Sequence, residues 1–292
     1  MKEALSATRQ QALLSCPRKH YWRYEVRLRR ETDADALRFG SAWHRAMEAR
    51  WQGRAYDECL AAGIGQATDL DELQVATLSG MLAGYMDRYR EDIVKTLHPE
   101  IPYRMALANS RTFDTVGKID GLGVLHDGRL ALVEHKSVGE DIGPESDYWL
   151  RLRNNPQCYE YVLAARALGW DVAICIYDVA RKPAIRQKQS ETPEQFGERL
   201  AADTRERPDF YFARREVPIL EDDLAEYQVQ RLELSRLILA FRASARRAQR
   251  PEHGWPRNID GFACRRCDYA SFCLQNIVPD PALPPAGFKT GA

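Results

Sequence analysis

Three charged residues whose types and spacing could do chemistry lie on either side of a predicted turn. Asp120 precedes the turn, and Glu134 and Lys136 follow it. Two carboxylates brought together repel each other unless a cation lies between them, and their hard oxygen ligands suit Mg²⁺ or Mn²⁺. An ammonium on the same face can stabilise negative charge on a phosphate, or orient the attacking water. The same residues could instead form a cross-strand salt bridge in an ordinary hairpin.

The length of the turn decides whether the two carboxylates meet, because side chains alternate between the faces of a strand. A two-residue turn at Asp127-Gly128 would leave Asp120 and Glu134 on opposite faces. A three-residue loop with Gly128 in the left-handed conformation would instead set Asp120 directly opposite Glu134, with their Cβ atoms roughly 5 Å apart. We expect the three-residue loop, which brings both carboxylates into one site.

A histidine upstream and a Gln–Tyr pair downstream could complete such a site. His44 lies in a predicted helix, and an imidazole nitrogen is a good further ligand for Mn²⁺. Glu48, one helical turn after His44, could orient the imidazole ring of His44, or the two side chains could simply form an exposed pair on the helix surface. Gln157 and Tyr161 lie four residues apart, hence on one helical face, and a tyrosine can stack on a base or bond a phosphate. Taken singly, His44 and Tyr161 are also typical of core packing.

Together these residues resemble the PD-(D/E)XK nuclease superfamily, and within it the RecB-like branch. The namesake motif is present as Ile119-Asp120 and Glu134-His135-Lys136, with Ile where the name has Pro. The Gly-x-x-x-His and Gln-x-x-x-Tyr signatures of the branch match residues 40–44 and 157–161. The resemblance implies a metal site made of His44, Asp120, Glu134 and the backbone carbonyl of His135. It implies catalytic roles for Asp120, Glu134, Lys136, Gln157 and Tyr161.

Three of the seven cysteines crowd together near the C-terminus. Cys264, Cys267 and Cys273 give the spacing C-x2-C-x5-C, and Cys16 could supply a fourth thiolate. Four thiolates could hold zinc or an iron–sulfur cluster. Alternatively, these cysteines could be buried packing residues that bind no metal. The arrangement resembles the iron–sulfur nucleases of the RecB-like branch. That resemblance implies a [4Fe–4S] cluster, which would tie the first helix to the C-terminal segment.

The basic residues are distributed unevenly, although Lys+Arg and Asp+Glu are both 42 and the net charge is zero. Residues 18–30 and 236–250 are rich in arginine, and could neutralise phosphates or form solvated helix faces. The chain contains no G-x-x-x-x-G-K-[ST] loop. It therefore has no nucleotide-driven motor of its own, and would act alone or beside a helicase or recombination partner. The residues expected to contact DNA are Arg18, Lys19, Arg23, Tyr161, Arg265 and Arg266.

The expected fold class is α/β, with a restriction-endonuclease-like core in which helices flank a mixed sheet. This follows from predicted strands, then a crossover helix, then a buried strand. The strands are expected over 103–108, 112–125, 129–136, 171–179 and 210–217. The helices are expected over 6–24, 37–52, 70–95, 153–168, 193–206 and 220–248. The expected domains are an iron–sulfur lobe where DNA enters (1–30 plus 250–275), a nuclease core (37–248) with a helical insertion (53–97), and a disordered tail (279–292).

The predicted function is metal-dependent hydrolysis of DNA, by an exonuclease acting on single strands or ends in recombination or repair. No apolar run approaches the roughly 18 residues of a membrane span, and residues 1–5 show no signal-peptide pattern, so a cytoplasmic location is expected. One alternative is a catalytically inactive DNA-binding module that keeps the fold and the cluster. Another is a structural zinc protein with an incidental hairpin, which leaves the two branch signatures unexplained.

Overall fold

The computed structural model describes residues 1–32, 34–67, 69–92, 94–152, 155–280 and 282–291. The chain divides into two compact units. The first unit contains both termini. It also includes residues 104–117 and 225–248, which the sequence assigned to the nuclease core. Its ranges are Met1–Asp33, Arg104–Gly117 and Ala225–Ala292, and those of the second unit are Ala34–Tyr103 and Lys118–Leu224.

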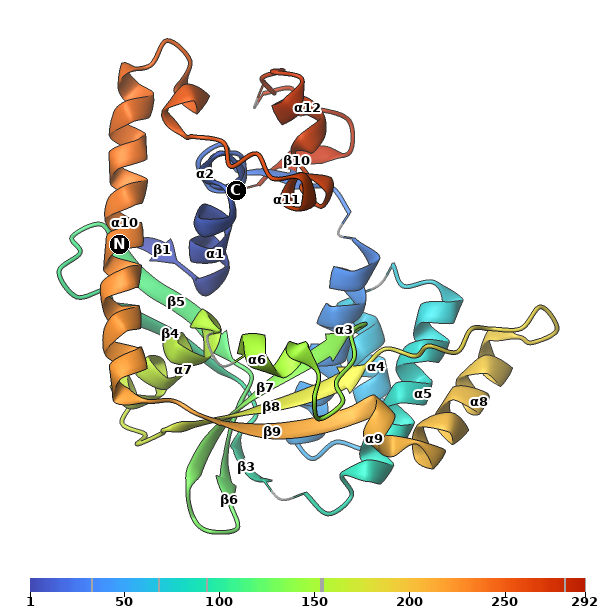
Figure 1. The fold of residues 1–292 in the computed structure, drawn as a ribbon. Helices are drawn as coiled ribbons and strands as arrows, with labels where there is room; N and C mark the ends of the chain where they lie inside the picture. The colour runs from blue at the N-terminus through green and yellow to red at the C-terminus, as the bar shows by residue number, and fades with distance from the viewer. Residues whose placement is uncertain (33, 68, 93, 153–154, 281, 292) are drawn as a thin grey trace. The chain divides into compact units, whose positions relative to one another are not determined.

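A mixed sheet forms the centre of the second unit (Figure 1). Its strands run in the order β3-β6-β7-β8-β9. The central pair β7 and β8 is parallel, and the other neighbouring pairs are antiparallel, which agrees with the expected α/β core. The bounds are β3 (Val94–His98), β6 (Gly121–Leu125), β7 (Leu130–Val138), β8 (Ile174–Arg181) and β9 (Phe212–Pro218).

Helices cover both faces of this sheet. On one face, Val133 and Ile176 pack against Trp51 of α3. On the other face, the Tyr177 hydroxyl contacts the Cys158 thiol of α7. The helices of the unit are α3 (Asp35–Trp51), α4 (Tyr56–Gln66), α5 (Glu72–Arg88), α6 (Asp147–Leu152), α7 (Pro156–Ala167), α8 (Pro193–Glu206) and α9 (Pro208–Tyr211). Of the helix expected over 153–168, residues 153 and 154 lie outside the described residues.

The segment 112–125, expected as one strand, is two strands with Asp120 at the break. β5 (Phe113–Ile119) belongs to a sheet with β1 (Glu3–Leu5) and β4 (Ile101–Ala106), whereas β6 belongs to the central sheet. Gly121 follows the break, and a Cβ atom there would lie 2.8 Å from the ring of Trp51. Only glycine therefore allows α3, the helix that carries His44, to pass this close to the chain beside Asp120.

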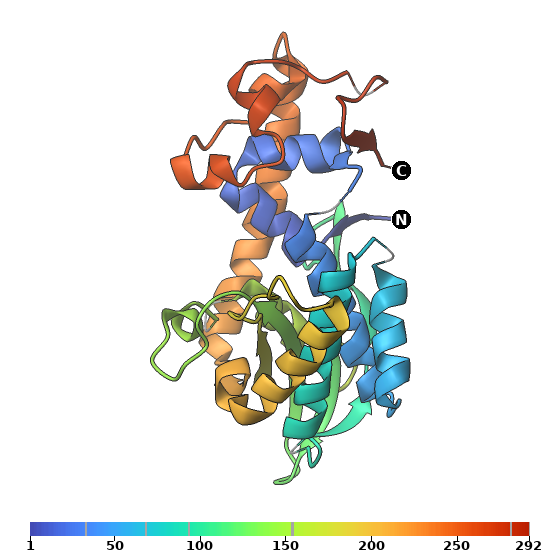
Figure 2. The same ribbon diagram turned by 90° about the vertical axis from the view of Figure 1, so that its right-hand side faces the viewer.

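The first unit packs its N-terminal elements with residues of the long helix α10 (Glu221–Arg247), which is seen from two sides in Figures 1 and 2. Leu13, Ile238 and Trp255 belong to its core. The helix expected over 6–24 is interrupted: Cys16 is extended, because Pro17 cannot continue the hydrogen-bond ladder of the preceding turn. The pieces are α1 (Ala7–Ser15), α2 (Pro17–His20) and the π-turn η1 (Tyr21–Glu25).

The C-terminal segment differs from the disordered tail expected over 279–292. Its last strand, β10 (Phe288–Thr290), pairs antiparallel with β2 (Leu28–Arg30). Phe288 is buried in a cluster with Trp22 and Phe272, and this apolar contact fixes a segment that its prolines alone would leave loose. The elements before it are η2 (Pro251–Gly254), α11 (Gly261–Arg265) and α12 (Ala270–Leu274). Pro281 and Ala292 lie outside the described residues.

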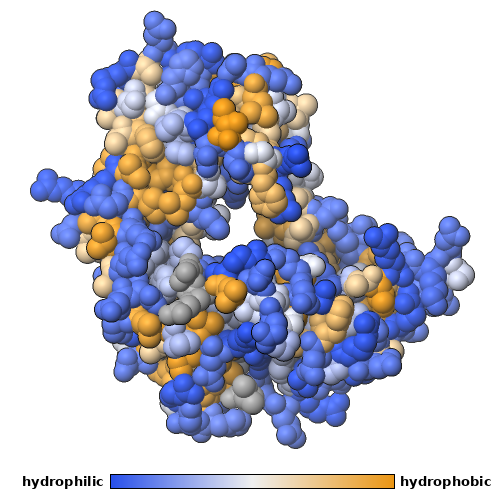
Figure 3. Space-filling model, in the orientation of Figure 1, coloured by the Kyte–Doolittle hydropathy of each residue, from blue (hydrophilic) through white to orange (hydrophobic). Residues whose placement is uncertain are grey.

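The surface is mainly hydrophilic on the face drawn in Figure 3, with hydrophobic residues in smaller groups. Large apolar side chains left exposed include Ile259, Phe262 and Leu274 of the first unit. Within the described ranges, no helix has the length and apolar character needed to cross a membrane.

Candidate active site

A cleft of about 410 Å³ lies in the second unit beside α3 and the start of β6. It is lined by residues that the sequence singled out, among them Gly40, His44, Asp120, His135 and Lys136. A carboxylate, an imidazole and an ammonium thus come from three separate stretches of chain to one place. The carboxylate of Glu134 is not among the described lining residues, but it accepts from the Lys136 ammonium. This is the kind of concave site, with a few convergent polar groups, at which ligands bind.

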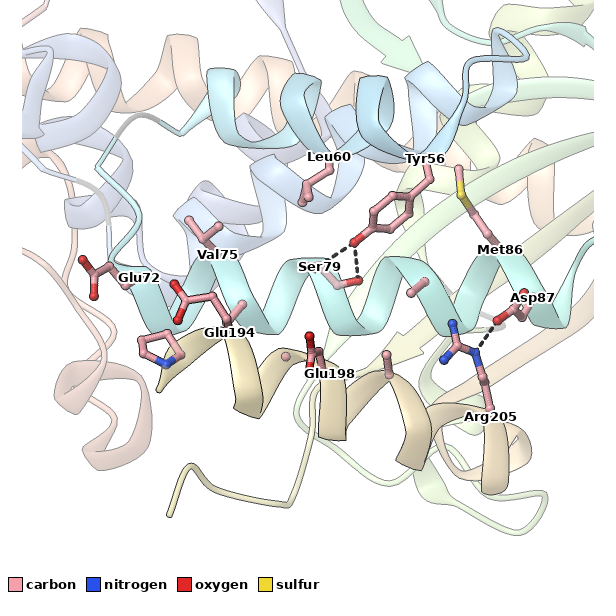
Figure 4. A pocket seen from close by; sticks show the side chains of 15 residues that line it. Tyr56, Leu60, Glu72, Val75, Ser79, Met86, Asp87, Glu194, Glu198 and Arg205 are labelled. Carbon is pink, nitrogen blue, oxygen red and sulfur yellow. Dashed lines mark hydrogen bonds and ion pairs between the residues drawn. The ribbon is translucent and has the colours of Figure 1, made fainter. Parts of the chain in front are cut away.

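A larger cavity of about 670 Å³ lies between α4, α5 and α8 of the same unit (Figure 4). Apolar side chains such as Leu60 and Val75 line it, together with the carboxylates of Glu72, Glu194 and Glu198. None of the predicted site residues is among its described lining residues. Carboxylates without a basic majority would repel a phosphate backbone, so the smaller cleft is the candidate active site.

The loop between β6 and β7 has the three-residue form expected from the sequence. The N–H of Leu125 donates to the carbonyl of Arg129 at 2.9 Å, and the N–H of Gly128 donates to the carbonyl of Leu125 at 2.9 Å. Gly128 has a φ of 87°, in the left-handed region that favours glycine. The predicted turn geometry is confirmed.

The register that follows from this loop places the two acids on one face. Gly121 pairs with Val133 across the antiparallel strands, so Asp120, one residue earlier, stands opposite Glu134. Lys136 is two residues beyond Glu134 and therefore shares that face. The predicted pairing of Asp120 with Glu134 is confirmed, while the chemical roles of these residues stay predictions.

Asp120 is held by two donors on the same oxygen. Its Oδ2 lies 3.1 Å from Nδ1 of His44 and accepts the backbone N–H of His135 at 3.1 Å. Burial acts to raise the pKa of Asp120. The hydrogen bond from His44 and the positive charges of His44, His135 and Lys136 outweigh burial and lower that pKa. The carboxylate is therefore ionised at neutral pH.

Glu134 is fully buried, and its two oxygens have different surroundings. Oε1 accepts from Nζ of Lys136, whereas Oε2 has no hydrogen-bond partner among the described residues. Burial and the nearby charge of Asp120 raise the pKa of Glu134. Burial would lower the pKa of Lys136, but the charges of Glu134 and Asp120 outweigh it and raise that pKa, so the ammonium stays charged.

Gln157 and Tyr161 reach the site through one chain of hydrogen bonds. Nζ of Lys136 donates to Oε1 of Gln157 at 3.1 Å, and Nε2 of Gln157 donates to the hydroxyl of Tyr161 at 2.7 Å. The side chain of Asn155 caps α7 by accepting the backbone N–H of Gln157 at 3.0 Å. This bond fixes the backbone from which the Gln157 side chain extends. Tyr161 is buried, so in this arrangement its ring supports Gln157 and is not open for stacking on a base.

The cleft also contains charged residues that the sequence argument missed or placed differently. Lys118 lines it and forms an ion pair with Glu100. Its position two residues before Asp120, on the same face, was a signal that could have found it. Glu48, which we considered as a partner for His44, instead accepts from Arg45 at 2.5 Å. Arg45 and Glu48 are three residues apart and so are neighbours on the helix surface, which favours their ion pair. His44 instead contacts Asp120.

The residues of the cleft fit a divalent cation in their chemistry. In the described part of the chain, no group of three or more His, Cys, Asp or Glu side chains is arranged as a ready ligand set for a metal ion. The donors themselves are two carboxylates and one imidazole, which suit Mg²⁺ or Mn²⁺. Oε2 of Glu134 is a buried carboxyl oxygen with no hydrogen-bond partner in the described part of the chain, a costly arrangement that a bound cation would relieve.

The four cysteines of the predicted cluster line one cavity of the first unit. This cavity measures about 240 Å³, and Cys16, Cys264, Cys267 and Cys273 all belong to its walls. The N–H of Asn258 lies 3.4 Å from Sγ of Cys16 and points a donor at that sulfur. Burial raises the pKa of the Cys267 and Cys273 thiols, and the charges of neighbouring cysteines add to this. The remaining cysteines, predicted to be packing residues, are buried: Cys59, Cys158 and Cys175.

The residues predicted to contact DNA differ in how freely they are presented. Arg18 is buried, and its Nε donates to the carbonyl of Trp255 at 2.9 Å, so its guanidinium is bound within the protein. Lys19 and Arg23 are half-buried, and Arg265 and Arg266 are exposed. In the stretch 236–250, the ion pairs of Arg242 with Glu3 and Glu25 are likewise internal to the unit.

Comparison with known families decides the relationship. A family model described as the PD-(D/E)XK nuclease superfamily matches residues 4–274. The chain belongs to this superfamily. Membership in the PD-(D/E)XK superfamily implies metal-dependent hydrolysis of phosphodiester bonds, and hence a DNA substrate. It also accounts for the α/β core with a sheet flanked by helices.

The similar proteins of known structure are distant. One is described as "Crystal structure of SSO0001", with 13% identity, a TM-score of 0.41, and coverage of 95% of this chain and 90% of that one. Another is "Crystal Structure of LHK-Exo in complex with dAMP", with 13% identity, a TM-score of 0.27, and coverage of 73% and 96%. No curated protein matches the sequence significantly.

Proposed function

We propose that this PD-(D/E)XK protein is a Mg²⁺- or Mn²⁺-dependent deoxyribonuclease, an exonuclease that acts on single strands or DNA ends in recombination or repair. The observation that carries the proposal is that Asp120 and Lys136 line one cleft, with His44 bonded to Asp120 and the buried Glu134 carboxylate bonded to Lys136. Superfamily membership supports phosphodiester hydrolysis. The preference for ends and the pathway come from the resemblance to the RecB-like branch.

In this proposal each residue of the cleft has a separate task. His44, Asp120, Glu134 and the carbonyl of His135 would hold the divalent ion, which when bound supplies Lewis acidity and lowers the pKa of water. Lys136 keeps its positive charge and would neutralise charge that develops on the phosphate. Gln157, fixed by Tyr161, holds the Lys136 ammonium through its side-chain oxygen.

A nuclease assay tests the proposal directly. Purified full-length protein is incubated with DNA labelled at either end, single- or double-stranded, with Mn²⁺, Mg²⁺ or EDTA. We expect mononucleotides or short products that accumulate progressively from one end, and no cleavage with EDTA. Cleavage inside a circular single strand would contradict the exonuclease assignment, and binding of DNA without cleavage under any metal would contradict the enzyme.

We further propose that Cys16, Cys264, Cys267 and Cys273 hold a [4Fe–4S] cluster. The support is that all four line one cavity of the first unit, from opposite ends of the chain. A single zinc ion would draw four sulfurs to within about 4 Å of one another, given Zn–S bonds of about 2.3 Å. The preference for an iron–sulfur cluster over zinc comes from the resemblance to the iron–sulfur nucleases of the RecB-like branch.

A further inference from the structure

A row of polar side chains crosses the central sheet on the face opposite Glu134 and Lys136. It runs through the paired positions His135 on β7, Asp178 on β8 and Arg214 on β9. Nδ1 of His135 lies 3.0 Å from Oδ2 of Asp178, and Nε of Arg214 lies 3.1 Å from Oδ1 of the same carboxylate. The three side chains are 3%, 0% and 6% exposed, so the row is within the protein interior.

Such a row is expensive to bury, and its surroundings compensate the charge of Asp178. The hydroxyl of Tyr85 donates to Asp178, and Arg214 also donates to Tyr85 at 2.7 Å and to Asp92 at 3.2 Å. Burial would raise the pKa of Asp178, but Arg214 and His135 outweigh it and hold that pKa well below its usual range. Packed apolar residues of the same size often give equal or greater stability than a buried ion pair, so stability alone does not account for the row.

His135 connects this row to the cleft on the other face of the sheet. Its backbone N–H donates to Asp120 at 3.1 Å, while its imidazole lies against Asp178. His135 is therefore held through both its backbone and its side chain. Glu134 and Lys136 are its immediate neighbours, so a rotation of the backbone at His135 would move both of their side chains. The ring of Trp51 packs edge-on against the imidazole, with centroids 5.5 Å apart, and leaves it little freedom.

We propose that Asp178, supported by Arg214, is a positioning residue that anchors the His135 side chain and thereby holds the Glu134 carboxylate and the His135 carbonyl in place to bind the divalent metal. This inference rests on the proposed metal-dependent nuclease function. It gives the histidine between Glu134 and Lys136 a task that the cleft itself does not explain. Partners that orient metal ligands in this way typically contribute about 10- to 100-fold to metal affinity or activity.

The test uses Asp178→Asn in the full-length protein, because asparagine keeps the shape and removes the charge. Mn²⁺ affinity is measured without DNA, from the loss of the free Mn²⁺ signal in electron paramagnetic resonance, and kcat and KM are measured on end-labelled DNA. We expect the Kd for Mn²⁺ to rise about 10-fold or more. At fixed Mn²⁺ kcat should fall while KM for DNA stays within about twofold, since Asp178 is not among the described residues that line the cleft.

A matched control separates positioning from general stability. Leu200 is fully buried in α8 of the same unit, so Leu200→Ala should lower the melting temperature by removing core packing. Its Mn²⁺ affinity should equal that of the unchanged protein. If Asp178→Asn does not fold, Tyr85→Phe removes only one donor to Asp178 and should raise the Kd severalfold.

The outcomes separate this inference from the function on which it rests. Wild-type Mn²⁺ affinity in folded Asp178→Asn, or in Tyr85→Phe if the first variant does not fold, would overturn the positioning role and leave the nuclease proposal intact. A loss of affinity equal to that of Leu200→Ala would also overturn it, because the effect would then be one of stability. If the unchanged protein neither binds Mn²⁺ nor cleaves DNA, the proposed function fails and the inference fails with it.

Discussion

Glu134 is the residue whose environment departs furthest from what a stable protein needs. It is fully buried, faces the like charge of Asp120, and leaves one carboxylate oxygen without a partner among the described residues. Each of these features costs stability, because a buried anion loses hydration. Residues held at such a cost are common at functional sites, where the cost serves activity.

Changing Glu134 to Gln should therefore separate activity from stability. We expect cleavage to fall by at least about 100-fold, since one of the carboxylates proposed to bind the metal is lost. The melting temperature should stay the same or rise, because the amide carries no charge to bury beside Asp120. Nuclease assays and thermal melting on the same preparation measure both effects.

Glu140→Gln is the control for this substitution, since Glu140 follows β7 but is exposed and pairs with Arg151. It should leave cleavage and melting near those of the unchanged protein. Near-normal turnover in the Glu134→Gln variant would remove Glu134 from the proposed mechanism.

His20 predicts how the stability of the first unit depends on pH. It is buried, stacks on Trp255 with ring centroids 5.1 Å apart, and accepts Nε of Arg9 at 3.1 Å. Burial, then the charges of Arg9 and Arg242, lower the pKa of His20 to about 3, against about 6.5 in the unfolded chain. The folded state thus favours the neutral ring. Its stability contribution is complete above pH 6.5 and is lost progressively as the pH falls towards 3.

Between pH 7 and pH 5 this single group should remove about 2 kcal/mol of stability, a shift of several degrees in melting temperature. His20→Gln keeps an acceptor for Arg9 but cannot be protonated, so its melting temperature should fall less over the same range. His126→Gln changes an exposed histidine of the β6–β7 loop and should behave like the unchanged protein. Equal pH slopes in all three proteins would contradict the assignment.

At the scale of elements, the β6–β7 loop sets the register on which the site depends. Gly128 adopts a φ of 87°, which costs other residues about 1 kcal/mol or more. Gly128→Ala should therefore lower stability by about that amount, and Gly128→Asn by less, because asparagine tolerates the left-handed region. Chemical denaturation of the three proteins measures the difference.

Gly65 provides the opposite case for comparison. It lies in α4 with open space around its Cα, and its φ is not in the positive range. Gly65→Ala should raise stability by up to about 1 kcal/mol, since alanine is the better helix former. If Gly128→Ala were as well tolerated as Gly65→Ala, the three-residue loop would not be what holds the register.

The elements also show which parts of the fold local sequence predicts. The helices α3, α8 and α10 agree closely with the ranges expected from the sequence, because the helical pattern of each lies within its own residues. The break at Asp120 was missed, since residues 112–125 read locally as one strand, and only their pairing with different partners divides them. The prolines of the tail predict disorder, whereas Phe288 is fixed by aromatic residues that include Trp22, far away in sequence.

The same distinction applies to the site. Asp120, Glu134 and Lys136 were predictable because a turn of known length relates them, and turn chemistry decides the face. Asp178 and Arg214 were not predictable, because only strand order brings them beside His135. Arg18 was assigned to DNA as one of a run of basic residues, and its burial against Trp255 depends on a contact 237 residues away in sequence.

At the scale of the whole molecule, the cysteine cavity predicts a stability effect confined to one unit. Protein purified without oxygen should contain about four irons per chain and absorb broadly near 400 nm. Cys273→Ala should lose that iron and destabilise the first unit more than the second, because ligand binding stabilises the structure around its ligands. Metal analysis and hydrogen exchange, compared between the ranges of the two units, measure this.

Cys59→Ala is the matched variant, since Cys59 is buried in the second unit and lies outside the cysteine cavity. It should retain all the iron. Zinc in place of iron would refute the cluster but keep the link between the termini, whereas a Cys273→Ala protein with full metal content would refute both.

The strand β5 belongs partly to the first unit and partly to the second. Its first residues pair with β1 within the first unit, and its last two, Lys118 and Ile119, belong to the second unit immediately before Asp120. β5 therefore connects, through its own backbone, the residues that pair with β1 to Asp120, a proposed metal ligand. Amide exchange at residues 118–120, compared with that at residues 113–115, would show how far along this strand the effect of losing the proposed cluster extends.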